Sequence, residues 1–252
     1  MKPEVQVTAI TGASSGIGRS LALRLARHGG AVALLARRAP LLEALADEIA
    51  AAGGRALAVP CDVTDHDQVR AAFALIEERL GPVDRLVANA GGGEKSYVDG
   101  FAADQVARII ALNVGGAASC IEAVLPGMLA RGHGHLVATS SLAASRGLPN
   151  AAAYSAAKAA LSRMMESLRI ELRPRGVDVT LIHPGFVRKP DRRRKALQIE
   201  LEAATARMCR AILARRAEDA FPLAPVLLTA LGRNLPARLY DRLMLSRVRR
   251  RP

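Results

Sequence analysis

A glycine-rich turn separates the first strand-like segment of this chain from the first helical one. Residues 5–10 form an apolar, β-branched run, and the loop 11–18 reads Thr-Gly-Ala-Ser-Ser-Gly-Ile-Gly before an amphipathic pattern over 17–28. Glycines let such a turn bend tightly and approach a ligand closely. The helix that follows would point free N–H groups and its positive dipole end at a pyrophosphate. The loop residues expected in such a site are Gly12, Ser14, Ser15, Gly16, Ile17 and Gly18.

Short apolar runs and longer helical patterns alternate as far as residue 182. The expected strands cover residues 5–10, 31–36, 55–60, 84–88, 135–140 and 177–182. The expected helices cover residues 17–28, 41–52, 67–80, 104–130 (bent near Gly115) and 151–172. This order predicts right-handed βαβ units and an α/β fold of the Rossmann type, with a doubly wound parallel sheet in three layers.

After residue 182 the alternation ends. Residues 190–217 are expected to form a loop and then a helix, with Ala220-Phe221 as the only hint of a last strand. Residues 223–232 and 236–248 favour short helices, so we expect a C-terminal helical extension over about 223–248. No linker or solenoid repeat interrupts the chain, and a single domain over 1–252 is expected.

The formal net charge of +13 admits two interpretations. An anionic partner is one, whether a phosphate-bearing cofactor, an acidic lipid surface or a nucleic acid. An arginine-rich composition spread over the chain is the other, and it accounts for most of the charge outside the clusters 188–195 and 247–251. Aromatic residues make up 3% of the chain, which argues against a base-stacking platform and hence against nucleic acid.

The cysteines and the hydropathy pattern bear on the compartment. Cys61, Cys120 and Cys209 have an odd count and no metal-ligand spacing, so neither a metal site nor a disulfide framework is expected. No uninterrupted apolar run approaches the roughly 18 residues of a membrane span. A cytoplasmic protein is expected.

The second strand ends at Ala36 and is followed by Arg37-Arg38. In dinucleotide-binding folds, an acidic residue here would bond a ribose 2′-OH, whereas an arginine accommodates a 2′-phosphate. Arg37, with Arg19, therefore favours NADP(H) over NAD(H). Two solvated arginines in an arginine-rich chain are the alternative.

Tyr154 and Lys158 stand four residues apart on an expected helix, so their side chains share one face. A phenol normally titrates near pH 10, and an adjacent cation lowers that pKa. The pair is expected to exchange a proton with a hydroxyl or carbonyl substrate. By itself it would more readily be a packed surface pair.

In order along the chain, these motifs resemble the short-chain dehydrogenase/reductase family. The resemblance covers residues 5–187 and rests on five features. They are the loop 11–18, Asp62-Val63 after the third strand, Asn89-Ala90-Gly91 after the fourth, the set Ser141, Tyr154 and Lys158, and Pro184-Gly185 after the sixth.

The resemblance implies a role for each position. Asp62 and Val63 would hold the adenine ring. Asn89, with Ala90 and Gly91, would stabilise the central sheet and the cofactor edge. Asn113 would anchor a water in a proton relay. The residues implied to line the nicotinamide side are Pro184, Gly185 and Val187.

The resemblance also implies the chemistry. Ser141, with Ser140 as the fallback, and Tyr154 would hold a substrate carbonyl while Lys158 bonds the nicotinamide ribose. The expected activity is hydride transfer between NADP(H) and a carbonyl or secondary alcohol, with Tyr154 as general acid/base. A non-catalytic dinucleotide-binding sensor or scaffold on the same fold is the alternative.

Two regions depart from the family pattern. Lys189 stands where the family often has a threonine, and residues 186–220 are expected to form the substrate loop. The C-terminal helix is basic and amphipathic. This pattern favours either packing against the protein's own substrate loop or a partner subunit, or peripheral contact with a membrane. It would also suit a lipophilic substrate. The resemblance further implies a homodimer or homotetramer.

Overall fold

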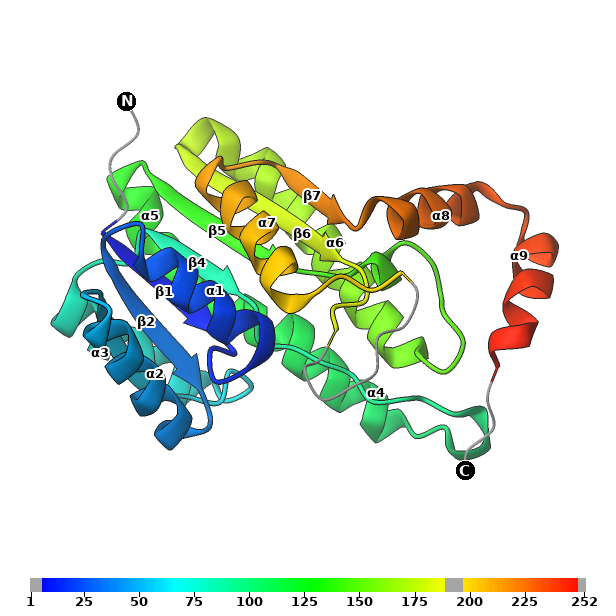
Figure 1. Ribbon diagram of the computed structural model, residues 1–252, viewed down its shortest axis with the longest axis horizontal. Coiled ribbons are helices and arrows are strands. Elements are labelled where there is room, and N and C mark those ends of the chain that lie inside the picture. The colour runs from blue at the N-terminus through cyan, green and yellow to red at the C-terminus, as the bar shows by residue number, and fades with distance from the viewer. Residues whose placement is uncertain (1–5, 189–196, 249–252) are drawn as a thin grey trace.

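The computed structural model describes residues 6–188 and 197–248 of the chain. Seven parallel strands form one sheet in the order β3-β2-β1-β4-β5-β6-β7, with helices on both faces (Figure 1). The expected three-layer, doubly wound Rossmann-type fold in a single domain is confirmed.

The strands are β1 (Val7–Thr11), β2 (Ala31–Ala36), β3 (Arg55–Pro60), β4 (Arg85–Ala88), β5 (Gly134–Thr139), β6 (Val177–Pro184) and β7 (Glu218–Phe221). The α-helices are α1 (Gly16–Ala26), α2 (Ala39–Ala51), α3 (His66–Leu80), α4 (Ala103–Ile110), α5 (Gly116–Arg131), α6 (Ala152–Leu172), α7 (Leu201–Leu213), α8 (Leu223–Asn234) and α9 (Ala237–Met244).

The central strands are buried on both faces, which explains their continuous apolar sequences. Alternate residues of β1 and β2 enter two different cores: Ala9 and Leu35 meet the helices α3, α5 and α6, whereas Ile10 and Leu34 meet α1, α2 and α7. Helices therefore seal both faces, and the polar ends of the strands are left to form a site at the sheet edge.

The strand order reverses between β1 and β4, which are neighbours in the sheet although β2 and β3 separate them in sequence. Chains leave these two strands in opposite directions, so a crevice forms at their carboxyl ends. The loop 11–18 follows β1, and Asn89 follows β4. The fold thus brings both motifs to the same crevice.

The long helix expected over 104–130 is two helices joined by a π-helical turn, Ala111–Gly115, in which the N–H of Gly116 bonds to the carbonyl of Ala111. π-turns of this kind often occur at functional sites. Asn113 lies in the middle of this turn.

In the described part of the expected substrate loop over 186–220, which is 186–188 and 197–220, most residues belong to α7 and β7. Helix α7 packs against α1, where Arg24 Nε donates to Thr205 Oγ1 at 3.1 Å, and β7 extends the sheet beside β6. Apolar residues at helical spacing on α7 enter the core and produce this packing. Lys189, together with most of the basic cluster 188–195, lies outside the described residues.

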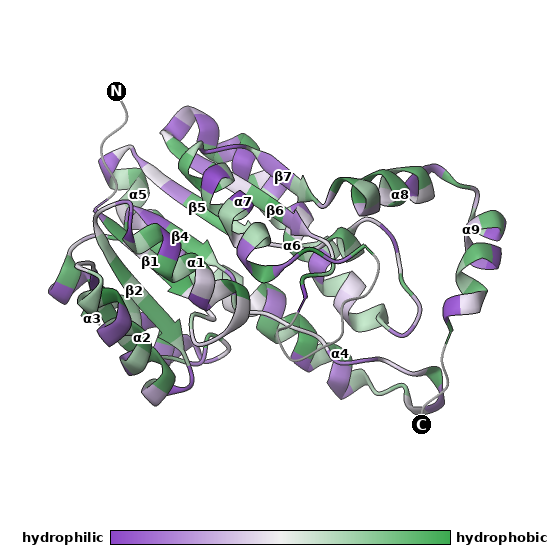
Figure 2. Ribbon diagram, in the orientation of Figure 1, coloured by the Kyte–Doolittle hydropathy of each residue, from purple (hydrophilic) through white to green (hydrophobic). Residues whose placement is uncertain are grey.

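Beyond β7 the chain leaves the sheet. Helix α8 projects from the carboxyl end of β7, and α9 turns at an angle to it (Figure 1). Figure 2 shows mostly apolar residues along α8 and a mixture of apolar and polar residues along α9. By length and composition, one helical stretch in the described residues, Ala103–Arg131, would reach across a membrane; its α5 part packs on β4 and β5 as a flank of the sheet.

Candidate active site

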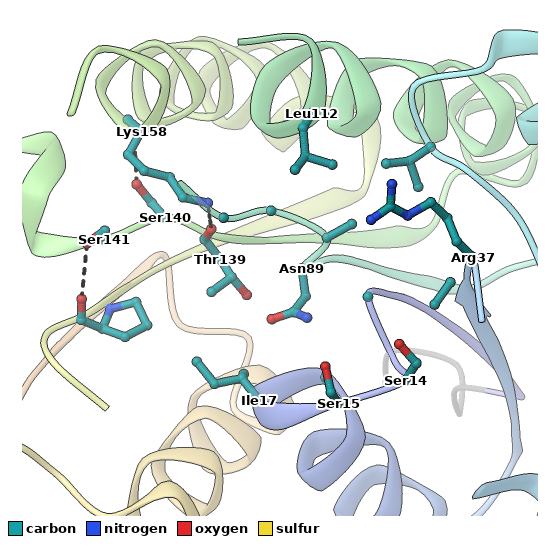
Figure 3. Close-up of a pocket in the computed structure, with 18 of the residues that line it drawn as sticks. Ser14, Ser15, Ile17, Arg37, Asn89, Leu112, Thr139, Ser140, Ser141 and Lys158 are labelled. Carbon is teal, nitrogen blue, oxygen red and sulfur yellow. Dashed lines mark hydrogen bonds between the residues drawn. The ribbon is translucent and has the colours of Figure 1, made fainter. Parts of the chain in front are cut away.

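A cavity of about 440 Å³ lies at the carboxyl edge of the sheet (Figure 3). Most of the site residues expected from the sequence line it. These are Gly12, Ser14, Ser15, Ile17, Gly18, Arg37, Asp62, Val63, Asn89, Ala90, Gly91, Ser141, Tyr154, Lys158, Pro184, Gly185 and Val187. The cavity therefore unites motifs that are separated by more than 170 positions in the chain.

The glycine loop is shaped by backbone geometry. Gly12 and Gly16 have positive φ angles of 68° and 54°, which residues with a Cβ rarely adopt. A Cβ at Gly18 would lie 2.2 Å from the Gly12 carbonyl oxygen. Gly16 shapes the turn without lining the cavity, so its contribution is conformational.

Asn89 ties the ends of the two central strands together. Its Nδ2 donates to the carbonyl of Thr11 at 3.1 Å, and its backbone N–H donates to Thr11 Oγ1 at 3.0 Å. The same hydroxyl accepts the N–H of Ala90 at 2.9 Å. Thr11 and Asn89 thus hold the floor of the cavity rigid.

The Asn113 side chain is fully buried and bonds to backbone. Its Nδ2 donates to the carbonyls of Gly92 at 2.8 Å and Ile109 at 2.9 Å, and its Oδ1 accepts the Gly92 N–H at 3.2 Å. A Cβ at Gly91 would lie 2.6 Å from Asn113 Oδ1 and 3.1 Å from Lys158 Nζ. Asn113 therefore lies behind the cavity lining, where it fixes the 91–92 turn against the lysine.

Ser141 begins the turn that follows β5. Its Oγ accepts the N–H of Ala143 at 3.1 Å and lies 3.5 Å from the Pro184 carbonyl, to which it donates (Figure 3). Ser140, the fallback position, is buried with its hydroxyl on Ser162 Oγ and the Lys158 carbonyl. Ser141 is thus the serine that lies beside the tyrosine.

Burial raises the pKa of the Tyr154 phenol, and a hydrogen bond with Ser141 opposes that rise. The sequence predicted a lower pKa from the adjacent lysine, and that prediction is wrong for this structure. Burial disfavours the phenolate, and the Lys158 ammonium lies 5.8 Å from the centre of the tyrosine ring. The tyrosine is held in its protonated form.

Lys158 is buried, and its Nζ donates to the carbonyl of Thr139 at 2.8 Å (Figure 3). Burial lowers the pKa of this ammonium to about 8, because the charged form has lost its hydration. A lysine that titrates near neutrality is typical of functional sites.

Thr139 was not predicted. It is the last residue of β5, and its hydroxyl is buried in the cavity wall with no hydrogen-bond partner in the part of the chain that the structure describes. A buried hydroxyl without a partner is costly, so a bound group is expected to satisfy it. No motif in the sequence marks this threonine.

The arginines after β2 are arranged differently from the expectation. Arg38 donates to Ser14 Oγ at 2.9 Å and to Ser15 Oγ at 3.0 Å, whereas Arg37 is exposed and lies 3.8 Å from Asp62. Arg19 pairs with Glu48 on α2 and does not line the cavity. Arg38 was not among the expected site residues; its place directly after Arg37, at the end of β2, is the sequence feature that could have indicated it.

The cavity fits a dinucleotide by the shape and chemistry of its walls. Gly12, Gly18 and Gly91 line it without side chains, at positions where a Cβ would crowd neighbouring protein atoms, and a helix N-terminus with two serines faces it. The Thr139 hydroxyl and the Lys158 ammonium offer polar groups at the other end. Among the described residues no group of three metal-ligating side chains occurs, and all three cysteines are buried thiols.

The family model of the short chain dehydrogenases matches residues 6–199. The chain belongs to this family. It is 44% identical over 236 residues to an uncharacterized oxidoreductase of Myxococcus xanthus, which covers 92% of this chain and 93% of the relative. This short-chain dehydrogenase is therefore an oxidoreductase by family.

Two solved structures share the architecture. A short-chain dehydrogenase from Streptomyces avermitilis superposes with a TM-score of 0.83 at 29% identity, covering 98% of this chain and 99% of the other. An alcohol dehydrogenase from Thermococcus sibiricus, complexed with 5-hydroxy-NADP, has a TM-score of 0.79 at 29% identity, covering 86% and 96%. The first match extends the likeness to nearly the whole chain, the C-terminal part included.

Proposed function

We propose that this short-chain dehydrogenase transfers a hydride between NADP(H) and a carbonyl or secondary alcohol, with Tyr154 as general acid/base. The observation that supports it is the meeting of Ser141, Tyr154 and Lys158 at one end of the glycine-lined cavity. Bound there, the nicotinamide would supply or accept the hydride. A hydrolytic role is disfavoured because the site offers a proton donor and an oxygen-binding serine without an activated nucleophile.

The residues of the chain divide the remaining work. The Ser141 hydroxyl, turned away from the Pro184 carbonyl, and the Tyr154 hydroxyl would both donate to a substrate carbonyl oxygen. They would so orient it and stabilise its developing negative charge. Tyr154 would then give that oxygen its proton. Asn113 would act through the Gly91–Gly92 turn, which it fixes beside Lys158, and the loop 11–18 would hold the pyrophosphate.

The direction of the pKa change favours reduction at neutral pH. Burial keeps the Tyr154 phenol protonated, and a protonated phenol is a donor. Oxidation of an alcohol needs the phenolate, so its rate is expected to rise with pH, while the rate of reduction stays level through neutrality. Initial rates in both directions over a pH series would check this.

Arg37 and Arg38 support NADP(H) as the cofactor. Neither is acidic, and both line the cavity at the end of β2 where a ribose 2′-phosphate would lie. The bound 5-hydroxy-NADP of the Thermococcus sibiricus relative agrees with this choice. Lys158 would bond the nicotinamide ribose at the opposite end.

The Tyr154→Phe variant tests the activity. It removes the proton donor and leaves the cavity walls in place, so turnover is expected to fall by roughly a thousand-fold or more while NADPH binding is retained. NADPH fluorescence titration and a panel of carbonyl substrates would measure the two. If the wild-type protein bound NADPH but turned over no substrate of the panel, the result would instead favour the dinucleotide-binding sensor.

Members of the family act on small molecules and commonly form oligomers. For this chain we propose a homodimer or homotetramer in the cytoplasm. Light scattering on the purified protein and fractionation of cells would test these two points separately.

A further inference from the structure

The segment 223–248, here called the C-terminal arm, carries an unusual amount of exposed apolar surface. No residue of α8 is buried, and between Leu223 and Gly232 its only polar side chain is Thr229. A helix that is apolar all round normally lies in a protein core or in lipid. The large apolar side chains of the arm that stand exposed are Leu223, Leu227, Leu228, Leu231, Leu239, Leu243, Leu245 and Val248.

The arm is nevertheless held in place on the body of the protein. Arg146 donates through NH1 to the carbonyls of Gly232 at 2.6 Å and Leu235 at 2.8 Å, and its guanidinium stacks 4.0 Å from the centre of the Tyr240 ring. The Tyr240 hydroxyl donates to the Gly147 carbonyl at 2.7 Å. The leucines are thus presented on a fixed scaffold, with the polar contacts on the inner side.

The charge of the arm indicates what covers it. From residue 223 to the C-terminus the sequence has seven arginines and one aspartate. Of these, Arg233, Arg238, Arg242 and Arg247 lie in the described part and alternate with the exposed leucines. An isologous dimer through this arm would place like charges of both copies in one contact. An anionic lipid surface would neutralise them.

The place of the arm in the fold connects it with the cavity. Arg146 and Gly147 belong to the turn that follows Ser141, and α8 contacts the short 3₁₀-helix Leu142–Ala144 in that turn. Phe186, 65% exposed, follows the cavity residue Gly185. The arm therefore lies on the same carboxyl edge of the sheet as the cavity mouth (Figures 1 and 2).

We propose that the C-terminal arm seats this protein on an anionic lipid surface. The apolar sides of α8 and α9 enter the boundary between headgroups and acyl chains, and the arginines pair with lipid phosphates. Docking on this edge turns the mouth of the cavity toward the lipid. The inference extends the proposed function and does not depend on it, because lipid binding is measured without turnover.

Vesicle co-sedimentation of the full chain tests the proposal. The wild-type protein is expected to pellet with vesicles of phosphatidylcholine mixed with phosphatidylglycerol, and to bind phosphatidylcholine alone far more weakly. The double variant Leu227→Asp/Leu231→Asp replaces two exposed apolar side chains with carboxylates. It should lower the partition coefficient between vesicles and buffer by at least about tenfold. A matched control, Ile170→Asp, changes an exposed residue on α6 and should bind like the wild type.

A second pair of variants separates charge from apolar contact. Arg238→Glu/Arg242→Glu should reduce binding to the anionic vesicles by roughly tenfold or more. The control Arg173→Glu/Arg175→Glu changes two exposed arginines at the opposite edge of the sheet, before β6, and should leave binding unchanged. Circular dichroism would confirm that all variants fold.

Three outcomes would overturn the proposal. One is a wild-type protein that stays in the supernatant with anionic vesicles. Another is equal binding by Leu227→Asp/Leu231→Asp and its control. The third is a dimer in lipid-free buffer, measured by light scattering, that Leu227→Asp/Leu231→Asp abolishes while no vesicle binding is found; a second copy would then cover the arm.

Discussion

The cavity edge and the C-terminal arm are both built at the carboxyl ends of the strands, but they are stabilised in opposite ways. At the cavity, polar side chains such as Thr11 and Asn89 bond to backbone between adjacent strands, and close-packed glycines shape the walls. In the arm, one arginine and one tyrosine hold two helices whose apolar residues face outward. The cavity edge is packed so closely that it has little room for added atoms. The attachment of the arm, in contrast, depends on the contacts of two side chains.

The sharpest test of this contrast is to add one methyl group to each region by replacing a glycine with alanine. Gly18→Ala places a Cβ 2.2 Å from the Gly12 carbonyl oxygen and 2.8 Å from Asn89 Nδ2, so the loop must move. We expect cofactor affinity to fall by roughly a hundred-fold or more, with a loss of about 2–4 kcal/mol in unfolding free energy. NADPH titration and chemical denaturation would measure both.

Gly232→Ala is the matched change in the arm. Its Cβ would meet the Tyr240 ring at 3.6 Å, an ordinary contact, and alanine favours the helix by about 1 kcal/mol. The unfolding free energy should be unchanged or slightly raised, and the affinity for the cofactor should be unchanged. Equal damage from both substitutions would contradict the contrast between the two regions.

The cavity edge could be predicted from the sequence because parallel strands place residues that follow them at a common edge. The loop 11–18, Asn89, Ser141 and Pro184 each follow a strand, so the order of strands and helices brings them together. Arg38 and Thr139 were not predicted as site residues, because their place in the site depends on the directions of their side chains. Spacing gives position along an element and not the direction of a hydroxyl or guanidinium.

The pKa of Tyr154 and the arm show what local patterns cannot supply. The four-residue spacing brought Lys158 near the tyrosine, but burial determines the direction of the pKa change. The expected helical extension over 223–248 is present, with α8 and α9 beginning near the expected residues. Its attachment depends on Tyr240 and Gly147, which are 93 positions apart, and no periodicity encodes such a contact.

The next largest effect is expected for a variant that releases the arm from the body of the protein. Arg146→Ala removes two hydrogen bonds to carbonyls and the stacking on Tyr240, so the arm should open while the sheet remains folded. Amides of residues 237–247 are expected to exchange with solvent roughly 10- to 100-fold faster. Hydrogen exchange with mass spectrometry would measure this.

The control for that experiment is Arg163→Ala, which removes an exposed arginine paired with Glu166 on α6. Exchange in the arm should not change in it. If Arg146→Ala instead accelerated exchange equally in β4, β5 and the arm, the arm would be part of the cooperative core and the contrast between regions would fail.

The arginines after β2 should affect cofactor choice more than stability. Arg37→Asp and, separately, Arg38→Ala remove a cation from the expected 2′-phosphate position. Affinity for NADPH should fall by about tenfold or more in each variant. Affinity for NADH should change little in Arg37→Asp, and it should fall less than that for NADPH in Arg38→Ala, which also releases Ser14 and Ser15. Fluorescence titration with both cofactors would measure the ratio, with Arg70→Ala on α3 as a surface control. A preserved NADPH preference in both variants would remove these arginines as the selectors.

The smallest expected effect is a pH dependence confined to the cavity. Burial lowers the pKa of Lys158 to about 8, so the ammonium is present below that pH and is lost above it. Affinity for the anionic cofactor should therefore weaken several-fold as the pH rises through about 8. Lys158→Met should bind more weakly and lose this step; an identical step in the variant would assign it to another group. Exchange in the arm should stay level over the same range after correction for the intrinsic rate, because Arg146 and Tyr240 hold the arm and Lys158 does not.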